Sequence, residues 1–140
     1  MSIVVDTSIS LAWYFPDESD EVAEAALDYV AEKRAVVPIH WAVEMANGLM
    51  MAVRRNRISE QERREAIADL QDLNFVTDQA GLNTLWQSAM GLADLHQLSI
   101  YDSMYLETSI RLGLPLATAD KALKHAAAAE SVAVFETGTP

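Results

Sequence analysis

The stretch MSIVVDTS, residues 1–8, contains a short apolar run that ends directly at an acid, Asp6. A continuous apolar run of this length is typical of a strand that is buried on both faces of a sheet. We therefore predict a buried strand at residues 2–5, with Asp6 immediately after its carboxyl end.

Short apolar segments alternate with helical patterns along the rest of the chain. Further strands are predicted at residues 35–37, 75–77, 116–118 and 132–135. Helices are predicted at residues 8–14, 19–33, 38–55, 59–73, 82–98, 100–112 and 121–129. Ser59 and Glu62 form a capping-box pattern, and Gly113 is typical of a helix C-cap. This alternation predicts an α/β fold with three layers, α/β/α, around a short-stranded and mainly parallel sheet.

The length and composition predict one compact domain over residues 1–140. About half of the residues are apolar, at 51%, which is enough for a sizeable core. No apolar run is long enough to span a bilayer, and the first residues lack the basic flank and cleavage site of a signal peptide. The absence of cysteine excludes disulfides and thiolate metal sites. We expect a cytoplasmic protein.

The net charge of −11, from 21 acids and 10 bases, is unlike that of a generic nucleic-acid binder, which is usually basic. Two interpretations remain open. The acids either form a soluble surface, or some of them gather in a pocket where a cation offsets their charge. Composition does not separate the two, so the positions of the acids have to decide.

Four acids are predicted to lie at one edge of the sheet. Asp6 follows the first strand, and Asp120 follows the fourth. Glu44 lies in the first turns of the helix after the second strand, and Asp102 lies in the first turn of the helix near residue 100. Sites in open α/β sheets form beyond the carboxyl ends of the strands, and the four acids converge there if the helix that carries Asp102 also starts at this edge.

Each acid also has a structural interpretation. Asp102 suits a helix N-terminus, Asp120 suits an N-cap, and Asp6 suits a turn. Glu44 is different because it lies on an otherwise apolar helix, and a carboxylate is rarely buried without a partner. Asn47, at helical spacing from Glu44, either orients this carboxylate or simply satisfies it.

Several carboxylates in one place need either protonation or a divalent cation. Hard oxygen ligands suit Mg²⁺ or Mn²⁺, whereas zinc is a poor fit because the histidines lie far apart in the sequence. Other chemistries lack their motifs: no glycine-rich phosphate loop follows the first strand, and no nucleophile elbow is present.

Four segments resemble the motifs of PIN-domain ribonucleases, in order and over nearly the whole chain. They are VVDTS at 4–8, PIHWAVEMANGL at 38–49, SIYDSMYLETS at 99–109 and LATADKAL at 116–123. One such motif is weakly specific, but the four together, at this spacing, resemble the VapC-type toxins of toxin–antitoxin pairs.

That resemblance implies a PIN-like α/β/α fold and an endoribonuclease that depends on Mg²⁺ or Mn²⁺. It implies that one acidic quartet binds the metal and carries catalysis: Asp6, Glu44, Asp102 and Asp120. Ser8 and Thr118 match positions of supporting hydroxyls. The expected partners are RNA, a VapB-type antitoxin and a second copy of the chain. Whether one or two metal ions bind is left open.

Basic and apolar surface residues have two interpretations each. Arg54, Arg55 and Arg57 at a helix end, and Lys121 beside Asp120, either contact RNA phosphates or only solvate helix ends. Two apolar stripes belong either to the core or to an interface. One helix carries a stripe that is a candidate for binding the antitoxin: Met45, Leu49, Met50 and Val53. Another helix carries a stripe that is a candidate for the dimer interface: Trp86, Met90 and Ala93.

Two functional classes therefore remain. One is a ribonuclease toxin that cleaves RNA phosphodiester bonds with a metal-activated water. The alternative is a catalytically inactive PIN-like RNA-binding or protein-scaffold module. The intact quartet favours the ribonuclease, because a scaffold does not need four converging acids. The sequence identifies neither the RNA target nor the antitoxin.

Overall fold

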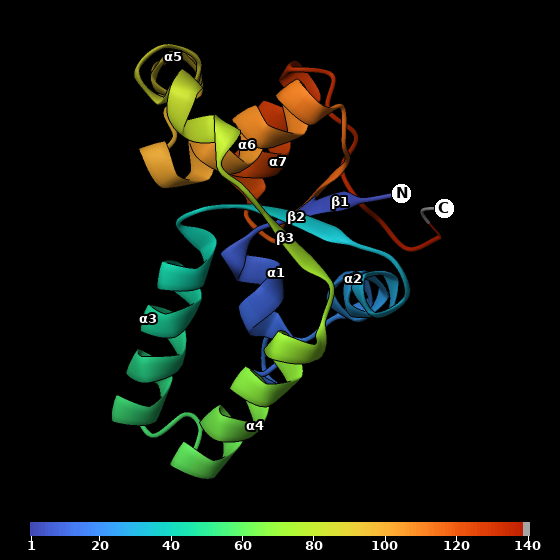
Figure 1. The fold of residues 1–140 in the computed structure, drawn as a ribbon, viewed down its shortest axis with the longest axis vertical. Helices are drawn as coiled ribbons and strands as arrows, with labels where there is room; N and C mark the ends of the chain where they lie inside the picture. Colours follow the sequence, from blue (N-terminus) through green and yellow to red (C-terminus); the bar gives the residue numbers. More distant parts are fainter. Residues whose placement is uncertain (139–140) are drawn as a thin grey trace.

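The computed structural model describes residues 1–138. Strands and helices alternate along the chain as expected for an α/β protein (Figure 1). The strands are β1 (Ile3–Val5), β2 (Ala35–Pro38), β3 (Phe75–Asp78) and β4 (Leu116–Ala117). The helices are α1 (Thr7–Ala12), α2 (Glu21–Glu32), α3 (Trp41–Arg54), α4 (Glu60–Asp72), α5 (Met90–His96), α6 (Ile100–Leu112) and α7 (Lys121–Ala129).

The sheet has the strand order β3-β2-β1-β4, and every pair in it is parallel. Val4 in β1 is paired with Val36 on one side and with Leu116 on the other, so β1 is central. All three residues of β1 are fully buried. A central parallel strand is covered on both faces, which is why its sequence is apolar without alternation.

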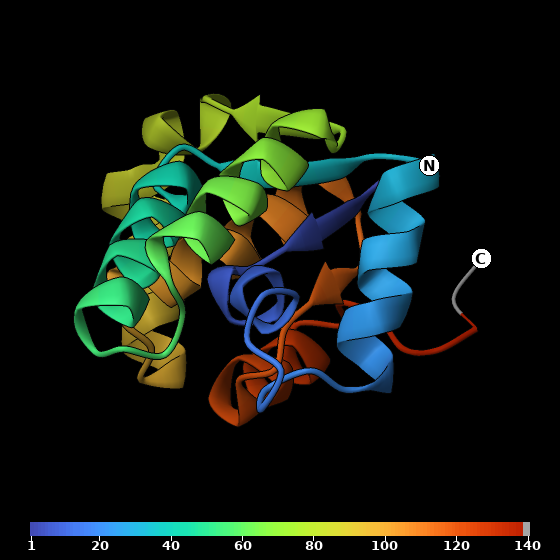
Figure 2. The ribbon, with the colours of Figure 1, turned by 90° about the horizontal axis from the view of Figure 1, so that it is seen from below.

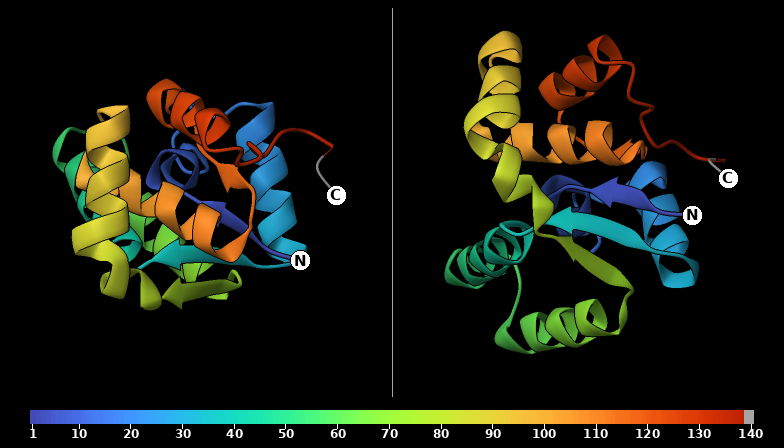
Figure 3. Two further views of the ribbon diagram at one scale, coloured as in Figure 1. Left: turned by 90° about the horizontal axis from the view of Figure 1, so that it is seen from above. Right: turned by 45° about the horizontal axis from the view of Figure 1, so that its top comes forward.

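Successive residues of β1 point to opposite layers. Ile3 and Val5 pack with α1 and α2, whereas Val4 packs with α6 and α7. Figure 1 and Figure 3 show α5, α6 and α7 on one face of the sheet and α1 to α4 on the other. Figure 2 shows α1 beneath the sheet, between α2 and α3. The predicted three-layer fold is confirmed.

Gly48 on α3 lies where this helix meets α1. A Cβ atom there would come within 2.8 Å of Leu11 Cδ1. Glycine therefore permits the close approach of α3 to α1, one helical turn after Glu44. The predicted capping box at Ser59 and Glu62 is present, and Gly113 caps α6 with a positive φ of 66°.

The segment before α6 is not the continuous helix predicted at 82–98. It forms a 3-10 turn (Ala80–Thr84), a π turn (Leu85–Ala89) and then α5. An ionic network holds the first of these turns in place: Arg111 on α6 contacts Asp78 at 2.5 Å and Glu107 at 2.7 Å. Glu107 also accepts a hydrogen bond from Thr84, at 2.8 Å. These contacts between distant residues override the local helical pattern.

Two further predictions of secondary structure were wrong. The predicted strand at 132–135 is reduced to one parallel bridge between Val134 and Leu116. Its partner β4 is only two residues long, and Phe135 packs instead on the side of the sheet covered by α2. Pro38 ends β2, paired with Asp78, and the following helix begins only at Trp41.

In the described part of the chain, none of the helices combines the length and the apolar character that crossing a membrane would require.

Candidate active site

Asp6 lies at the carboxyl end of β1 and caps the N-terminus of α1. Its Oδ1 accepts hydrogen bonds from the Ile9 backbone N–H at 3.1 Å and from Ser8 Oγ at 2.7 Å. Its Oδ2 accepts a hydrogen bond from Thr118 Oγ1, just beyond β4. Ser8 and Thr118, the two predicted supporting hydroxyls, therefore both contact Asp6. The carboxylate is buried, with 3% of the residue exposed.

Burial raises the pKa of Asp6 to about 6, from the ordinary value of 3.8. Hydrogen bonds from Thr118, Ser8 and the Ile9 backbone act in the opposite direction, and the negative charge of Asp102 raises the pKa further. The charged form of Asp6 is thus disfavoured in the folded protein unless a cation is bound beside it.

This pKa predicts a stability change with pH in EDTA. Between pH 3.8 and about 6, Asp6 ionises in the unfolded chain but stays protonated in the folded one. The folded state then binds more protons, so stability falls as pH rises, by about 3 kcal/mol in all. Asp6→Asn removes this loss and is expected to be about 1–3 kcal/mol more stable than the wild type at pH 7, with little difference at pH 4. Urea unfolding at both pH values measures it; equal stabilities at pH 7 would contradict it.

Glu44 lies in the first turn of α3 and is partly buried. Its Oε1 accepts hydrogen bonds from Thr7 Oγ1 at 3.0 Å and from Tyr105 Oη at 2.7 Å. The Thr7 and Tyr105 hydroxyls are themselves 2.8 Å apart. These contacts join α1, α3 and α6 at one carboxylate oxygen.

His40, at the N-terminus of α3, also approaches Glu44. Its Nε2 lies 3.3 Å from Glu44 Oε1 and 3.1 Å from the Tyr101 carbonyl oxygen. Burial lowers the pKa of His40, against the opposing effect of Glu44 and Asp102. Because the Tyr101 carbonyl oxygen can only accept, Nε2 carries the proton that it donates to this oxygen, and Glu44 Oε1 lies beside the donor.

Asp102 and Asp120 complete the set. The Asp102 backbone N–H donates to Ser99 Oγ, which caps α6, and Asp120 Oδ1 caps α7 by accepting from the Leu123 N–H at 2.8 Å. Burial raises the pKa of Asp102, and the charges of Asp120 and then Glu44 raise it further. Because the charge of Asp102 also raises the pKa of Asp6, the four predicted acids share one electrostatic environment. Asp102 and Asp120 therefore also occupy the helix N-termini that their structural interpretation predicted.

The four acids are not drawn into a closed cage. Among residues 1–138, no group of three His, Cys, Asp or Glu side chains is close enough together to hold a metal ion. Mg²⁺ usually keeps several waters and takes only one or two protein carboxylates directly. The four carboxylates therefore fit an ion of this kind that is bound partly through water, and would not fit a site made of protein ligands alone.

The remaining predicted residues lie around this centre. Asn47 is exposed, and no hydrogen bond in the described chain joins it to Glu44. Lys121 is exposed directly after Asp120. Arg54 and Arg55 are exposed at the end of α3, about 15 Å along the helix from Glu44.

Arg57, the third arginine of this group, is engaged. Its guanidinium contacts Asp17 at 3.0 Å and Glu18 at 3.1 Å, and it lies over the Phe15 ring at 4.3 Å. These acids compete with any phosphate for Arg57, whereas Arg54 and Arg55 have no such contact among the described residues.

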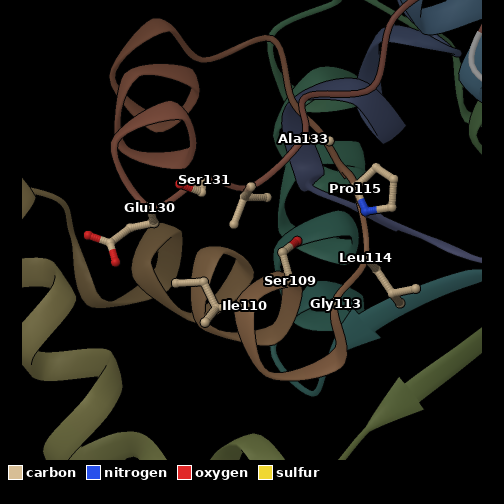
Figure 4. A pocket seen from close by; sticks show the side chains of 9 residues that line it. Ser109, Ile110, Gly113, Leu114, Pro115, Glu130, Ser131 and Ala133 are labelled. Carbon is tan, nitrogen blue, oxygen red and sulfur yellow. The ribbon is translucent and has the colours of Figure 1, made fainter.

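A pocket of about 300 Å³ lies apart from the acids. Figure 4 shows it between the end of α6, the residues before β4 and the segment after α7. Leu114 and Pro115 line it, and both precede β4, whereas Asp120 follows β4. The pocket therefore opens at the amino edge of the sheet, and it shares no residue with the acidic site.

Sequence reasoning missed Thr7 and Tyr105. Thr7 directly follows Asp6, and Tyr105 comes three residues after Asp102, so both lie beside predicted acids. Spacing of three residues puts Tyr105 on the same face of α6 as Asp102, which is the signal that could have found it.

Comparisons with known proteins identify the family of this chain. A family model described as the PIN domain matches residues 3–129. Ribonuclease VapC3 of Pyrobaculum aerophilum is 29% identical over 123 residues, which cover 88% of this chain and 92% of that protein.

Solved structures share the fold. The crystal structure of PAE2754 from Pyrobaculum aerophilum has a TM-score of 0.67 at 20% identity, over 90% of this chain and 79% of that one. A toxin–antitoxin complex from Klebsiella pneumoniae has a TM-score of 0.56 at 19% identity, over 84% of this chain and 86% of that one.

Proposed function

Because the chain belongs to the PIN-domain family, we propose that it is a metal-dependent endoribonuclease and the toxin of a VapBC-type pair. Its similarity to Ribonuclease VapC3 over most of both chains supports the ribonuclease activity. The observation that carries the proposal is the convergence of four acids from distant segments: burial raises the pKa values of Asp102 and Asp6, Asp120 and Glu44 add to the shift of Asp102, and Asp102 adds to that of Asp6. Four carboxylates that repel one another do not stabilise a fold, whereas they do bind a divalent cation, which offsets their charge.

In this proposal, Asp6, Glu44, Asp102 and Asp120 hold Mg²⁺ or Mn²⁺, directly or through water. When bound, such an ion lowers the pKa of a water molecule and stabilises the leaving oxygen of a phosphodiester. The chain's own contribution is orientation. Ser8 and Thr118 fix the Asp6 carboxylate, and the backbone N–H groups that start α1 and α7 fix Asp6 and Asp120.

The experiment that tests the proposal is brief expression of the chain in cells, followed by sequencing of the 5′ ends of RNA fragments. A ribonuclease produces new ends at a restricted set of sites, and an Asp102→Asn variant produces none of them. If the wild type binds RNA or protein without creating new ends, the inactive scaffold is the better interpretation.

We propose that a VapB-type antitoxin binds the groove between α3 and α4. This groove has a volume of about 810 Å³, and its lining includes Met45, Leu49 and Met50 from the predicted apolar stripe. Ile67 and Leu70 line it from α4, and the solved toxin–antitoxin complex of similar fold supports such a partner. An amphipathic helix is the segment that fits a groove of this kind.

Co-expression with the protein encoded beside this chain tests the antitoxin. We expect the pair to co-elute, and we expect Met50→Glu to weaken the complex, since a charge in an apolar groove is left without a partner. Ile110→Glu, an exposed apolar residue on α6, is the matched control. Co-elution that is unaffected by Met50→Glu would exclude this groove.

We propose further that the chain forms a homodimer. Large apolar side chains are exposed just before α3, on α3, α5 and α6, and in the π turn, and a second copy of the chain would cover them. They are Ile39, Val43, Trp86, Met90, Leu95 and Tyr101. Ala93, expected beside Trp86 and Met90, is half-buried on α5.

RNA is expected to reach this acidic protein through local positive charge. Lys121 is a basic residue directly after Asp120, and Arg54 and Arg55 are exposed at the tip of the α3–α4 hairpin. Replacing both arginines with Ala should weaken binding of single-stranded RNA and reduce its salt slope by about 0.7 for each phosphate that is no longer neutralised. Arg57→Ala is the matched control, because Asp17 and Glu18 already occupy its guanidinium. An unchanged slope in the double variant would assign these arginines to solvation only.

A further inference from the structure

All of the described hydrogen bonds to the Glu44 carboxylate reach one oxygen. Thr7 Oγ1, Tyr105 Oη and His40 Nε2 lie 3.0, 2.7 and 3.3 Å from Oε1. No hydrogen bond within residues 1–138 reaches Oε2. The carboxylate is therefore fixed at one end, and its other oxygen is left for a cation or for water.

The two hydroxyls come from the segments that carry the neighbouring acids. Thr7 follows Asp6 at the start of α1, and Tyr105 lies one turn after Asp102 on α6. Tyr105 is 1% exposed, and its hydroxyl lies 2.8 Å from that of Thr7. A single contact thus relates the position of Glu44 to those of two other members of the quartet.

We propose that Thr7 and Tyr105 form a hydroxyl clamp that positions the Glu44 carboxylate for a divalent cation. The two residues act through Glu44 and are positioning residues. This inference rests on the proposed metal-dependent function, and it assigns to that function two residues that the quartet does not include.

The chemistry of the clamp distinguishes it from a structural contact. Asp78 and Glu107 are held by the Arg111 guanidinium, which offsets their charge. Glu44 accepts hydrogen bonds from two hydroxyls, which carry no charge to offset its own.

The clamp also removes a cost of binding. A free glutamate side chain loses rotamer entropy when it is fixed. Because the hydroxyls fix Glu44 before any ion binds, this entropy is already lost when the protein folds. Loss of one hydroxyl should therefore weaken metal binding while the metal-free fold is retained.

The test uses Mg²⁺ alone, with thermal unfolding as the readout. Tyr105→Phe removes the clamp hydroxyl and keeps the ring, and the Mg²⁺ concentration for half-maximal stabilisation should rise about 10-fold. Thr108→Val is the matched control: it also removes a buried hydroxyl from α6, one that donates to the Met104 carbonyl at 2.7 Å. Its Mg²⁺ midpoint should equal that of the wild type.

Thr7→Val is a second variant from the other side of the clamp, and it is less buried than Tyr105, so the inference stays testable if Tyr105→Phe does not fold. It should shift the midpoint in the same direction. In cleavage assays, both variants should need more Mg²⁺ and approach the wild-type rate at saturating Mg²⁺.

Two results would overturn different statements. Midpoints of Tyr105→Phe and Thr7→Val within about 2-fold of the wild type would overturn the clamp and leave the proposed function intact. A wild-type protein that Mg²⁺ and Mn²⁺ do not stabilise would overturn the metal-dependent function itself, and the clamp with it.

Discussion

Asp102→Asn is expected to reduce RNA cleavage by the purified protein at least about 100-fold while leaving the fold intact. Asp102 lies at the solvent-facing start of α6, and its backbone N–H, which the substitution retains, makes the capping hydrogen bond to Ser99. Burial and the charges of Asp120 and Glu44 already raise the pKa of Asp102, so removing its charge should stabilise the metal-free protein slightly.

The measurement is fragment formation from a labelled RNA, with circular dichroism to verify the fold. Asp94→Asn is the matched control, since Asp94 is an exposed carboxylate on the neighbouring helix α5. It removes the same charge from the protein and should cleave at the wild-type rate. If purified Asp102→Asn protein, free of contaminating nuclease, cleaves RNA at the wild-type rate, Asp102 is not part of the active site.

Removal of divalent metal should reduce RNA cleavage about as strongly as Asp102→Asn does. EDTA is expected to stop cleavage, and Mg²⁺ or Mn²⁺ should restore it. At about ten times its dissociation constant, an ion that binds only the folded protein stabilises it by about 1.4 kcal/mol. For a domain of this size, that raises the melting temperature by about 4–5 °C.

The stabilisation by metal should depend on pH in the direction set by Asp6. Below the Asp6 pKa of about 6, the ion has to displace a proton, so more Mg²⁺ is needed at pH 5 than at pH 7.5. Asp6→Asn should lose most of this difference along with most of the affinity. Cleavage that persists in EDTA, with a melting temperature unaffected by Mg²⁺, would indicate a mechanism without metal.

The elements that the sequence predicted are those specified by local pattern. The apolar run of β1, the capping box at Ser59 and the C-cap at Gly113 each depend on a few adjacent residues, and each was confirmed. The segment at 80–89 was missed because Arg111, some thirty residues away in sequence, binds Asp78 there. The prediction of a strand at 132–135 was wrong because a strand needs a partner strand to pair with, and the neighbouring β4 is only two residues long.

The same distinction applies to the site. Parallel strands place the residues after them at one edge, so the sequence was enough to bring the four acids together as a prediction. Hydrogen bonds between side chains are not encoded in this way. Thr7 and Glu44 are 37 residues apart, and Thr7 and Tyr105 are 98 apart, so only the packing of three helices identifies their contact.

The central position of β1 has a consequence during synthesis. Asp6 is made well before its partner Thr118, which follows 112 residues later, beyond β4. A nascent chain whose β4 is still inside the ribosome lacks this hydroxyl, the Ala117 carbonyl that pairs with Asp6 N–H, and Asp120. If the proposed function holds, the ribosome that translates this ribonuclease is working beside an incomplete and inactive site until β4 and Asp120 have emerged.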